Sequence, residues 1–241
     1  MLNLRLAQPN LLIDITGIPE LTHVKNDVDS LTLGACITTA DIEDGRIGAD
    51  ALPMLAQIAG RIAYRAVRNR GTIGGSLCHA DPAADWTAAL AALGADAIVT
   101  DGARQRIVPI PCLIRGAFET NINPVEILQA IRIPKPSPRA RWGYYKVCRK
   151  AGEFALAIGA VYSDPERGAF RAVIGATSGA PVVVTDASAI FDGANSLQPK
   201  ARLDETATAR LLPAASREHH GARGRLYLTA LARATEEAQA Q

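Results

Sequence analysis

Gly71-Thr72-Ile73-Gly74-Gly75-Ser76, within the stretch from Arg68 to Asp85, is the segment around which this 241-residue chain is organised. It follows one helical pattern and leads into another. The three glycines lack Cβ atoms, so their backbone can take positive φ and approach a flat or anionic ligand closely. The two hydroxyl side chains can hydrogen-bond a diphosphate or a sugar. With arginines just before it and carboxylates just after it, we interpret the segment as a nucleotide cofactor loop.

A purely structural interpretation of the same stretch stands beside this one. A glycine cluster after a helix is often only a tight turn, and a Gly-rich string alone is a weak signal for phosphate binding. Asp81 followed by Pro82 is typical of a helix start, with Asp81 as the N-cap and Pro82 at the first helical position. Asp85 would then be no more than an acidic residue near the positive end of that helix.

The stretch resembles the FAD-binding medium subunit of the molybdenum hydroxylases, the group that contains carbon monoxide dehydrogenase and xanthine dehydrogenase. The likeness continues in register on both sides, through Gly34-Ala35-Cys36-Ile37-Thr38-Thr39-Ala40, Glu126-Ile127-Leu128, Tyr144-Tyr145-Lys146-Val147 and Arg149-Lys150-Ala151-Gly152-Glu153-Phe154-Ala155. This ordered set covers nearly the whole chain and is far less expected by chance than any single motif. The resemblance therefore favours the cofactor loop.

The resemblance implies an α+β fold in two parts. Residues 1–136 would form an FAD-binding domain of the PCMH (vanillyl-alcohol-oxidase-like) type. Residues 139–241 would form a small α/β sandwich domain of the CO dehydrogenase flavoprotein C-terminal type. We place the boundary at Pro134-Lys135-Pro136-Ser137-Pro138, because three prolines in five residues exclude a helix and an inner strand.

The family also implies a lobe before the point at which this chain begins, with a second Gly-rich loop for the FAD diphosphate. We therefore expect an amino-terminally truncated FAD domain, in which residues 1–136 are the second lobe and FAD affinity is lowered. Leu2–Leu6 alternates apolar and polar residues, and Leu11–Ile15 is expected to form a short strand. Strands that paired with the missing lobe would be left as exposed edges.

Eight residues are cofactor-binding candidates by this resemblance. Thr72, Ile73, Gly74, Gly75 and Ser76 would contact the FAD diphosphate, Asp85 would bond a cofactor hydroxyl, and Leu128 and Lys146 would line the flavin. Ser76 stands where the family commonly has asparagine, so a hydroxyl replaces an amide and one donor is lost. Ile62 matches a position that lies against the flavin ring in relatives, although an isoleucine on an apolar helix face is more often core.

Apolar periodicity predicts the elements that surround these residues. Helices are expected over Leu52–Val67 and Trp86–Leu93, the second ending at Gly94 as its C-cap. Strands are expected over Leu31–Ala35, Ala97–Thr100, Arg106–Val108, Glu126–Ile133, Trp142–Cys148, Phe154–Val161 and Ala169–Ala176, and further helices near Asp186–Phe191, Asp204–Leu212 and Ser216–Glu237.

Composition and charge bound the partners and the compartment. With 48 % hydrophobic and 21 % charged residues and a net charge of +2, the chain is expected to be soluble, with no nucleic-acid groove or polybasic membrane patch. No apolar run reaches the roughly 18 residues of a membrane helix, and the amino terminus has no basic segment followed by an apolar signal region, so we expect a cytoplasmic protein. The four dispersed cysteines and the pair His219 and His220 lack ligand spacing, so no metal site is predicted.

The function implied by the resemblance is that of one subunit in a three-part hydroxylase. A large molybdopterin subunit would oxidise the substrate, and a small subunit would hold two iron–sulfur clusters. This chain would accept the electrons on FAD and pass them to an external acceptor, in a dimer of heterotrimers. Two alternatives are a stand-alone FAD oxidoreductase and a truncated interaction protein that binds no FAD. No catalytic residue is predicted, because flavin performs the electron chemistry itself.

Overall fold

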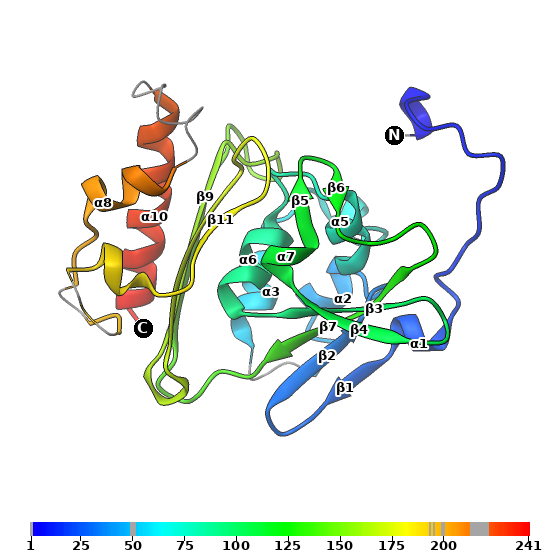
Figure 1. Ribbon diagram of the computed structural model, residues 1–241, viewed down its shortest axis with the longest axis horizontal. Coiled ribbons are helices and arrows are strands. Elements are labelled where there is room, and N and C mark those ends of the chain that lie inside the picture. Colours follow the sequence, from blue (N-terminus) through cyan, green and yellow to red (C-terminus); the bar gives the residue numbers. More distant parts are fainter. Residues whose placement is uncertain (1, 49–51, 193, 195, 199–200, 213–221) are drawn as a thin grey trace.

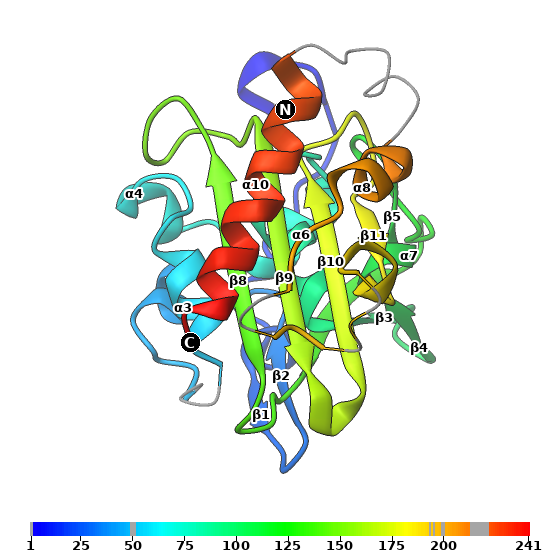
Figure 2. The same cartoon turned by 90° about the vertical axis from the view of Figure 1, so that its left-hand side faces the viewer.

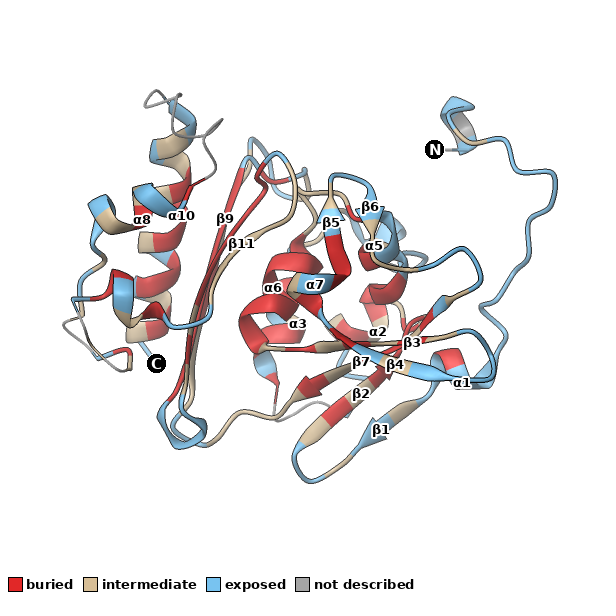
Figure 3. Ribbon diagram, viewed as in Figure 1, coloured by how far each residue is buried: buried red, intermediate tan, exposed pale blue. Residues whose placement is uncertain are grey.

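Two antiparallel sheets, with helices between them and outside the second one, make up the fold (Figure 1). The computed structural model describes residues 2–48, 52–192, 194, 196–198, 201–212 and 222–241. Helix α6 (Asp85–Leu93) lies between the sheets and contacts strands of both. All nine of its residues are buried, as the red ribbon in Figure 3 shows. The core of the molecule is therefore centred on this helix.

The first sheet has five strands in the order β1-β2-β7-β3-β4. Their bounds are Val24–Asn26, Ser30–Gly34, Ile127–Pro134, Asp96–Thr100 and Gln105–Pro109. The strands predicted over residues 31–35, 97–100, 106–108 and 126–133 are thus confirmed to within one residue or so at their ends, including the hairpin of β3 and β4. The central strand β7 alternates buried and partly exposed residues along much of its length, as a sheet with one covered face requires.

The predicted helix over residues 52–67 is wrong as a single element. The structure has α3 over Pro53–Ala59 and a separate α4 over Arg65–Arg68. Between them the chain turns at Ala63, which has a φ of 45°. The carbonyl oxygens of Ile62 and Ala63 accept hydrogen bonds from the Arg68 guanidinium in place of helical N–H groups. Because apolar residues keep a helical spacing through this turn, the periodicity alone did not reveal the break between α3 and α4.

The expected helix start at Asp81 and Pro82 is also wrong. Helix α6 begins at Asp85, with Ala84 as its N-cap. Asp81 instead closes a short turn by accepting from the Ala83 N–H at 2.9 Å. The Pro82 carbonyl accepts a hydrogen bond at 2.9 Å from the N–H of Ala176, which directly follows strand β10 (Ala169–Gly175) of the second sheet. This turn therefore connects the helix region to the second sheet. The predicted C-cap is confirmed, because Gly94 has a φ of 70°.

The second sheet has four strands in the order β11-β10-β9-β8, with bounds Val182–Val184, Ala169–Gly175, Ala157–Asp164 and Arg141–Val147. Every residue of β9 is buried, because α6 covers one face and α10 (Ala222–Gln239) covers the other (Figure 2). The predicted carboxy-terminal helix is confirmed from residue 222 onward, and residues 216–221 of that prediction lie outside the described residues.

Shorter elements complete the chain. They are η1 (Leu2–Leu4), α1 (Pro19–Thr22), α2 (Thr39–Glu43), α5 (Ile73–His79), α7 (Ile110–Leu113), β5 (Ile114–Gly116), β6 (Glu119–Thr120), η2 (Pro165–Arg167), η3 (Ala187–Ile190) and α8 (Glu205–Leu211). The described residues include no helix with the length and apolar character that crossing a bilayer requires.

The predicted strand at Leu11–Ile15 is not formed. Residues 5–18 contain no strand, and Figure 1 shows this segment running away from the body of the molecule. Leu11, Leu12 and Ile13 are all exposed. A strand needs a neighbour for its backbone N–H and C=O groups, and the edge strand of the first sheet begins only at Val24.

Two glycines let α10 approach the second sheet closely. A Cβ atom at Gly143 in β8 would overlap the carbonyl oxygen of Ala234, and one at Gly159 in β9 would overlap the backbone of Ala230. In each case the obstacle is helix backbone, which cannot swing aside as a side chain can. The closeness of this helix–sheet contact thus depends on the missing side chains.

Gly159→Ala is expected to lower the free energy of unfolding by about 3 kcal/mol or more, because the added methyl overpacks a rigid contact. Gly17→Ala is the matched control, since a Cβ there meets nothing within 4 Å. Urea denaturation followed by circular dichroism measures both. Equal free energies of unfolding for the two variants would contradict the close contact between α10 and β9 at Gly159.

Candidate functional site

The predicted cofactor loop begins α5 and is attached to the segment that follows β2. The Gly74 N–H donates to the Ala35 carbonyl at 2.9 Å, and the Ile73 N–H donates to the Ile37 carbonyl at 3.0 Å. In the opposite direction, the Thr39 N–H donates to the Gly71 carbonyl at 2.8 Å. The loop is therefore held in place by backbone pairing with residues 35–39.

Thr72 is the N-cap of α5, and it accepts from the Gly75 N–H at 3.0 Å through its hydroxyl. Its carbonyl accepts from the Ser76 N–H at 3.1 Å. The N–H groups of residues 73–76 thus all have partners within the protein. These N–H groups are therefore not free to bind a diphosphate. A diphosphate at this loop would instead contact the hydroxyl groups of Thr72 and Ser76 and the exposed backbone of Gly71 and Gly75, with a favourable contribution from the helix dipole.

The glycines of the loop have different roles, and none of them has a positive φ. Gly74 is buried, and a Cβ there would overlap Ala35, so close packing requires it. Gly75 is exposed, and a Cβ there would meet only the Thr72 side chain, at 2.7 Å from its hydroxyl oxygen. At Gly71 a Cβ would meet only the Val67 carbonyl. Gly71 and Gly75 leave an open backbone surface that a side chain would fill, which fits close approach of a cofactor.

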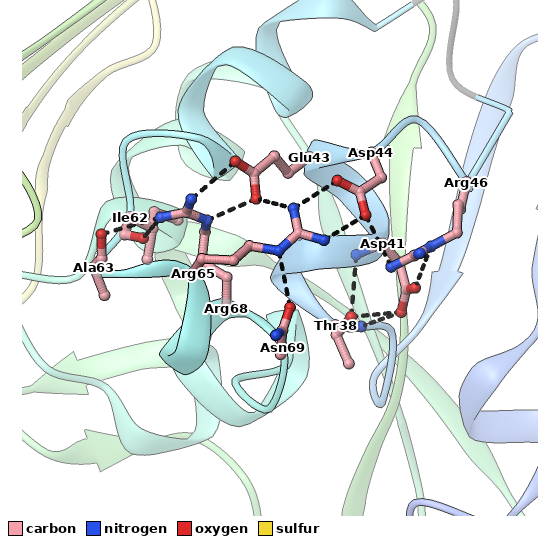
Figure 4. A network of polar contacts seen from close by, with 10 residues as sticks. All are labelled: Thr38, Asp41, Glu43, Asp44, Arg46, Ile62, Ala63, Arg65, Arg68 and Asn69. Carbon is pink, nitrogen blue, oxygen red and sulfur yellow. Dashed lines mark hydrogen bonds and ion pairs between the residues drawn. The ribbon is translucent and has the colours of Figure 1, made fainter.

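A network of ion pairs fixes α4 just before this loop (Figure 4). Glu43 in α2 accepts from Arg68 at 2.7 and 2.9 Å and from Arg65 at 2.9 Å. Arg65 also donates to both carboxylate oxygens of Asp44 at 2.6 Å. Hydrogen bonds from Arg68 are the main reason that the pKa of Glu43 lies below its ordinary value. Arg65 and Arg68 of α4 are therefore already paired with carboxylates.

The network begins at the start of α2. Thr38 and Asp41 form a capping box at its N-terminus, and Asp41 pairs with Arg46 at 2.8 Å. Arg46 in turn reaches Asp44 at 3.1 Å. The Thr38 side chain is thus used for helix capping.

Asp85 and Lys146, which lie 61 positions apart in the sequence, meet between the two sheets. The Lys146 ammonium lies 3.1 Å from the Asp85 carboxylate and donates to the Arg61 carbonyl at 2.9 Å. The Tyr144 hydroxyl donates to the same carboxylate at 2.8 Å. The side chains of Lys146 and Asp85 are only 5 % and 8 % exposed. The structure therefore brings two of the predicted site residues into one buried cluster.

Burial raises the pKa of Asp85, while the Lys146 ammonium and the Tyr144 hydroxyl favour its charged form. Burial also raises the pKa of Tyr144 well above its ordinary value, and the nearby carboxylate adds to this. Tyr144 therefore keeps its proton and donates a hydrogen bond to Asp85. Both carboxylate oxygens have protein partners, and the predicted bond from Asp85 to a cofactor hydroxyl stays a prediction.

A cavity of about 560 Å³ lies beside this cluster. Its wall includes Arg61, Tyr64, Arg68, Tyr145, Lys146 and Gly152. Gly152 has a φ of 87°, and a Cβ there would lie 2.8 Å from the Ala63 carbonyl oxygen, so the loop after β8 lies directly against the turn between α3 and α4. An ammonium has three N–H donors, and the Asp85 and Arg61 contacts of Lys146 leave one for a ligand in the cavity.

Leu128 and Ile73 are placed elsewhere. Both are buried in the core cluster between the sheets, with exposed fractions of 4 % and 0 %, and neither is among the residues that line the cavity. Ile62 packs against the same core cluster. Among the described residues, no group of three histidine, cysteine or acidic side chains is arranged to hold a metal, and His219 and His220 lie outside them.

Tyr144 and Arg61 are site residues that sequence reasoning did not single out. Tyr144 carried a usable signal, because residues two apart in a strand share a face, and Lys146 was already a candidate. Arg61 carried none, since its part depends on the break between α3 and α4 that the periodicity missed.

Comparison with known proteins shows the family and the fold of this chain. Residues 1–136 match the family described as FAD binding domain in molybdopterin dehydrogenase. The nicotine 6-hydroxylase medium subunit of Paenarthrobacter nicotinovorans is 32 % identical over 91 % of this chain and 78 % of its own length. The caffeine dehydrogenase subunit beta of Pseudomonas sp. strain CBB1 is 33 % identical over 69 % of this chain. That match spans only 57 % of the relative.

A solved structure of carbon monoxide dehydrogenase from Hydrogenophaga pseudoflava shares the fold, with a TM-score of 0.85 and 29 % identity over 98 % of this chain and 84 % of the other. The protein is thus of the class with an α+β FAD-binding domain followed by a carboxy-terminal sandwich, as in the carbon monoxide dehydrogenase medium chain. The chain belongs to the family of FAD-binding domains in molybdopterin dehydrogenases.

Glu43→Gln is expected to lower the free energy of unfolding by about 1 kcal/mol at pH 7, because it removes the charge shared by Arg65 and Arg68. The pKa of Glu43 is lowered in the folded state, so its contribution is present above the ordinary value of 4.5 and is lost as the pH falls through the lowered value.

The gap between the wild type and Glu43→Gln should therefore shrink below about pH 4.5 in urea denaturation series. Glu20→Gln, at an exposed residue of α1, is the control. Its free energy of unfolding should equal that of the wild type both at pH 7 and below about pH 4.5. A gap for Glu43→Gln that does not depend on pH would contradict the ion-pair network.

Proposed function

We propose that this chain is the medium subunit of a molybdenum-containing hydroxylase or dehydrogenase. In this function it accepts electrons from iron–sulfur clusters on FAD and passes them to an external acceptor. The observation that carries the proposal is the cavity between the α3–α4 turn and the end of β8, with the buried Lys146 ammonium on its wall. Membership of an FAD-binding family supports it.

The residues that would hold FAD are those expected from the family: Thr72, Ile73, Gly74, Gly75 and Ser76 at the diphosphate, Asp85 at a hydroxyl, and Leu128 and Lys146 beside the flavin. The open surface at Gly71 and Gly75 suits the first role, and the cavity suits a flavin contact of Lys146, whereas Leu128 is not among the residues that line it. When bound, FAD supplies the redox chemistry, taking up and releasing electrons that amino-acid side chains cannot carry.

The chain's own residues bind and orient in this scheme. Lys146 presents a positive charge and one hydrogen-bond donor to the cavity, and Asp85 keeps that charge in place. Tyr64 contributes an aromatic side chain to the wall, and it is 61 % exposed. Buried Ile73 and Leu128 anchor the strand and helix beneath the diphosphate loop.

The names of the relatives support the proposed partners. They include a medium subunit of a nicotine hydroxylase and a medium chain of carbon monoxide dehydrogenase. We accordingly propose a small subunit with two iron–sulfur clusters and a large molybdopterin subunit as partners, in a dimer of heterotrimers. Residues 1–136 would be the second lobe of the FAD domain and residues 139–241 the carboxy-terminal domain.

The test of FAD binding is titration of the purified chain with FAD, followed by desalting and an absorption spectrum. The wild type should retain flavin bands. Gly75→Val should weaken FAD binding by about tenfold or more, because the side chain fills the open surface at the start of α5. Gly17→Val, at an open position outside the site, is the control. A colourless wild type would overturn FAD binding by this chain.

The subunit role is tested by tagging the chain in its native host and assaying the purified material for flavin, iron and molybdenum. Iron and molybdenum are expected in a fixed ratio to the chain, together with two other polypeptides. Flavin without either metal would contradict the medium-subunit role and favour a stand-alone FAD oxidoreductase.

A further inference from the structure

Tyr144 stands behind the cavity wall and not on it. Its side chain is 1 % exposed, and it is not among the residues that line the cavity, whereas its neighbours Tyr145 and Lys146 are. Its hydroxyl donates to one Asp85 oxygen at 2.8 Å. Lys146, two residues along β8 and on the same face of the strand, lies 3.1 Å from the same carboxylate.

Asp85 thus has two partners that both come from β8. A buried carboxylate with one partner could rotate toward any other donor, but two donors from one rigid strand fix both its position and its plane. Arg61 adds a second tie to the strand, because its guanidinium donates to the Tyr144 carbonyl at 3.1 Å and its carbonyl accepts from the Lys146 ammonium at 2.9 Å. Each member of this cluster restricts the next one.

We propose that Tyr144 is a positioning residue for cofactor binding: by holding the Asp85 carboxylate, it keeps the Lys146 ammonium on the cavity wall with one N–H directed to the cofactor. This proposal rests on the proposed function, in which the cavity takes the flavin part of FAD. Tyr144 itself touches no cofactor in this scheme, and its whole effect passes through Lys146.

Tyr144→Phe removes the hydroxyl and keeps the ring that fills the core. The variant is expected to fold, to bind FAD about tenfold more weakly than the wild type, and to shift the absorption bands of the bound flavin. The shift is the readout that a purely structural role would not produce, because loss of stability alone lowers the amount of bound flavin and leaves its spectrum unchanged.

Tyr162→Phe is the matched control. Tyr162 is a buried tyrosine of the same sheet, 3 % exposed, and its hydroxyl donates to the carboxylate of Asp164 at 3.0 Å. Tyr162 does not line the cavity and is not a hydrogen-bond partner of Lys146 or Asp85. Its loss should leave FAD affinity within about twofold of the wild type, with an unchanged flavin spectrum.

A double-mutant cycle decides whether Tyr144 acts through Lys146. In a Lys146→Met background, Tyr144→Phe should have no further effect on FAD affinity or on the spectrum, because the ammonium that it positions is gone. Asp85→Asn is a second variant that leaves the tyrosine in place, and it should give the same spectral shift as Tyr144→Phe.

The proposal is overturned if Tyr144→Phe binds FAD as the wild type does with the same spectrum, or if its effect persists undiminished in the Lys146→Met background. In both results the wild type still binds FAD, and the proposed function stands. A wild type that binds no FAD overturns the proposed function and this proposal together.

Discussion

The buried contact of Asp85 with Lys146 and Tyr144 is the polar interaction that ties the edge strand of the second sheet to the helix between the sheets. Removing a carboxylate and an ammonium from water is unfavourable unless each has well-placed partners, and removing one partner of such a pair typically costs about 3–5 kcal/mol. Asp85 begins the helix that lies between the sheets, and both of its partners belong to the edge strand of the second sheet. The contact is satisfied only when that strand docks against the helix in one register.

The cavity follows from this docking. Its wall combines the turn between α3 and α4, the end of β8 and the loop that contains Gly152, so neither sheet region contains it alone. The positive φ values of Ala63 and Gly152 occur where these segments touch. Residues from separate parts of the chain thus form one cavity wall, and the segment that begins α5 is held by its backbone pairing with residues 35–39.

Much of the sheet structure could be predicted from the sequence, because strands with one covered face alternate and hairpins carry turn residues. The break between α3 and α4 could not, since its apolar spacing is helical and its turn is stabilised by Arg68, a side-chain contact that periodicity does not report. Asp81 and Pro82 were predicted to begin a helix, but a contact with Ala176 in the second part holds them in a turn. Gly74 shows a further limit: it was chosen for cofactor approach, while the structure requires it for packing against Ala35.

The central claim is that Lys146, fixed by the buried Asp85, meets the cofactor in the cavity between the α3–α4 turn and the end of β8. A crystal structure of the chain in its longest native form with FAD bound tests it most directly. The account predicts the flavin in the cavity, with a polar atom about 2.7–3.2 Å from the Lys146 ammonium and the Asp85 contact intact. A flavin bound elsewhere, or a Lys146 that leaves Asp85 when FAD binds, would contradict it.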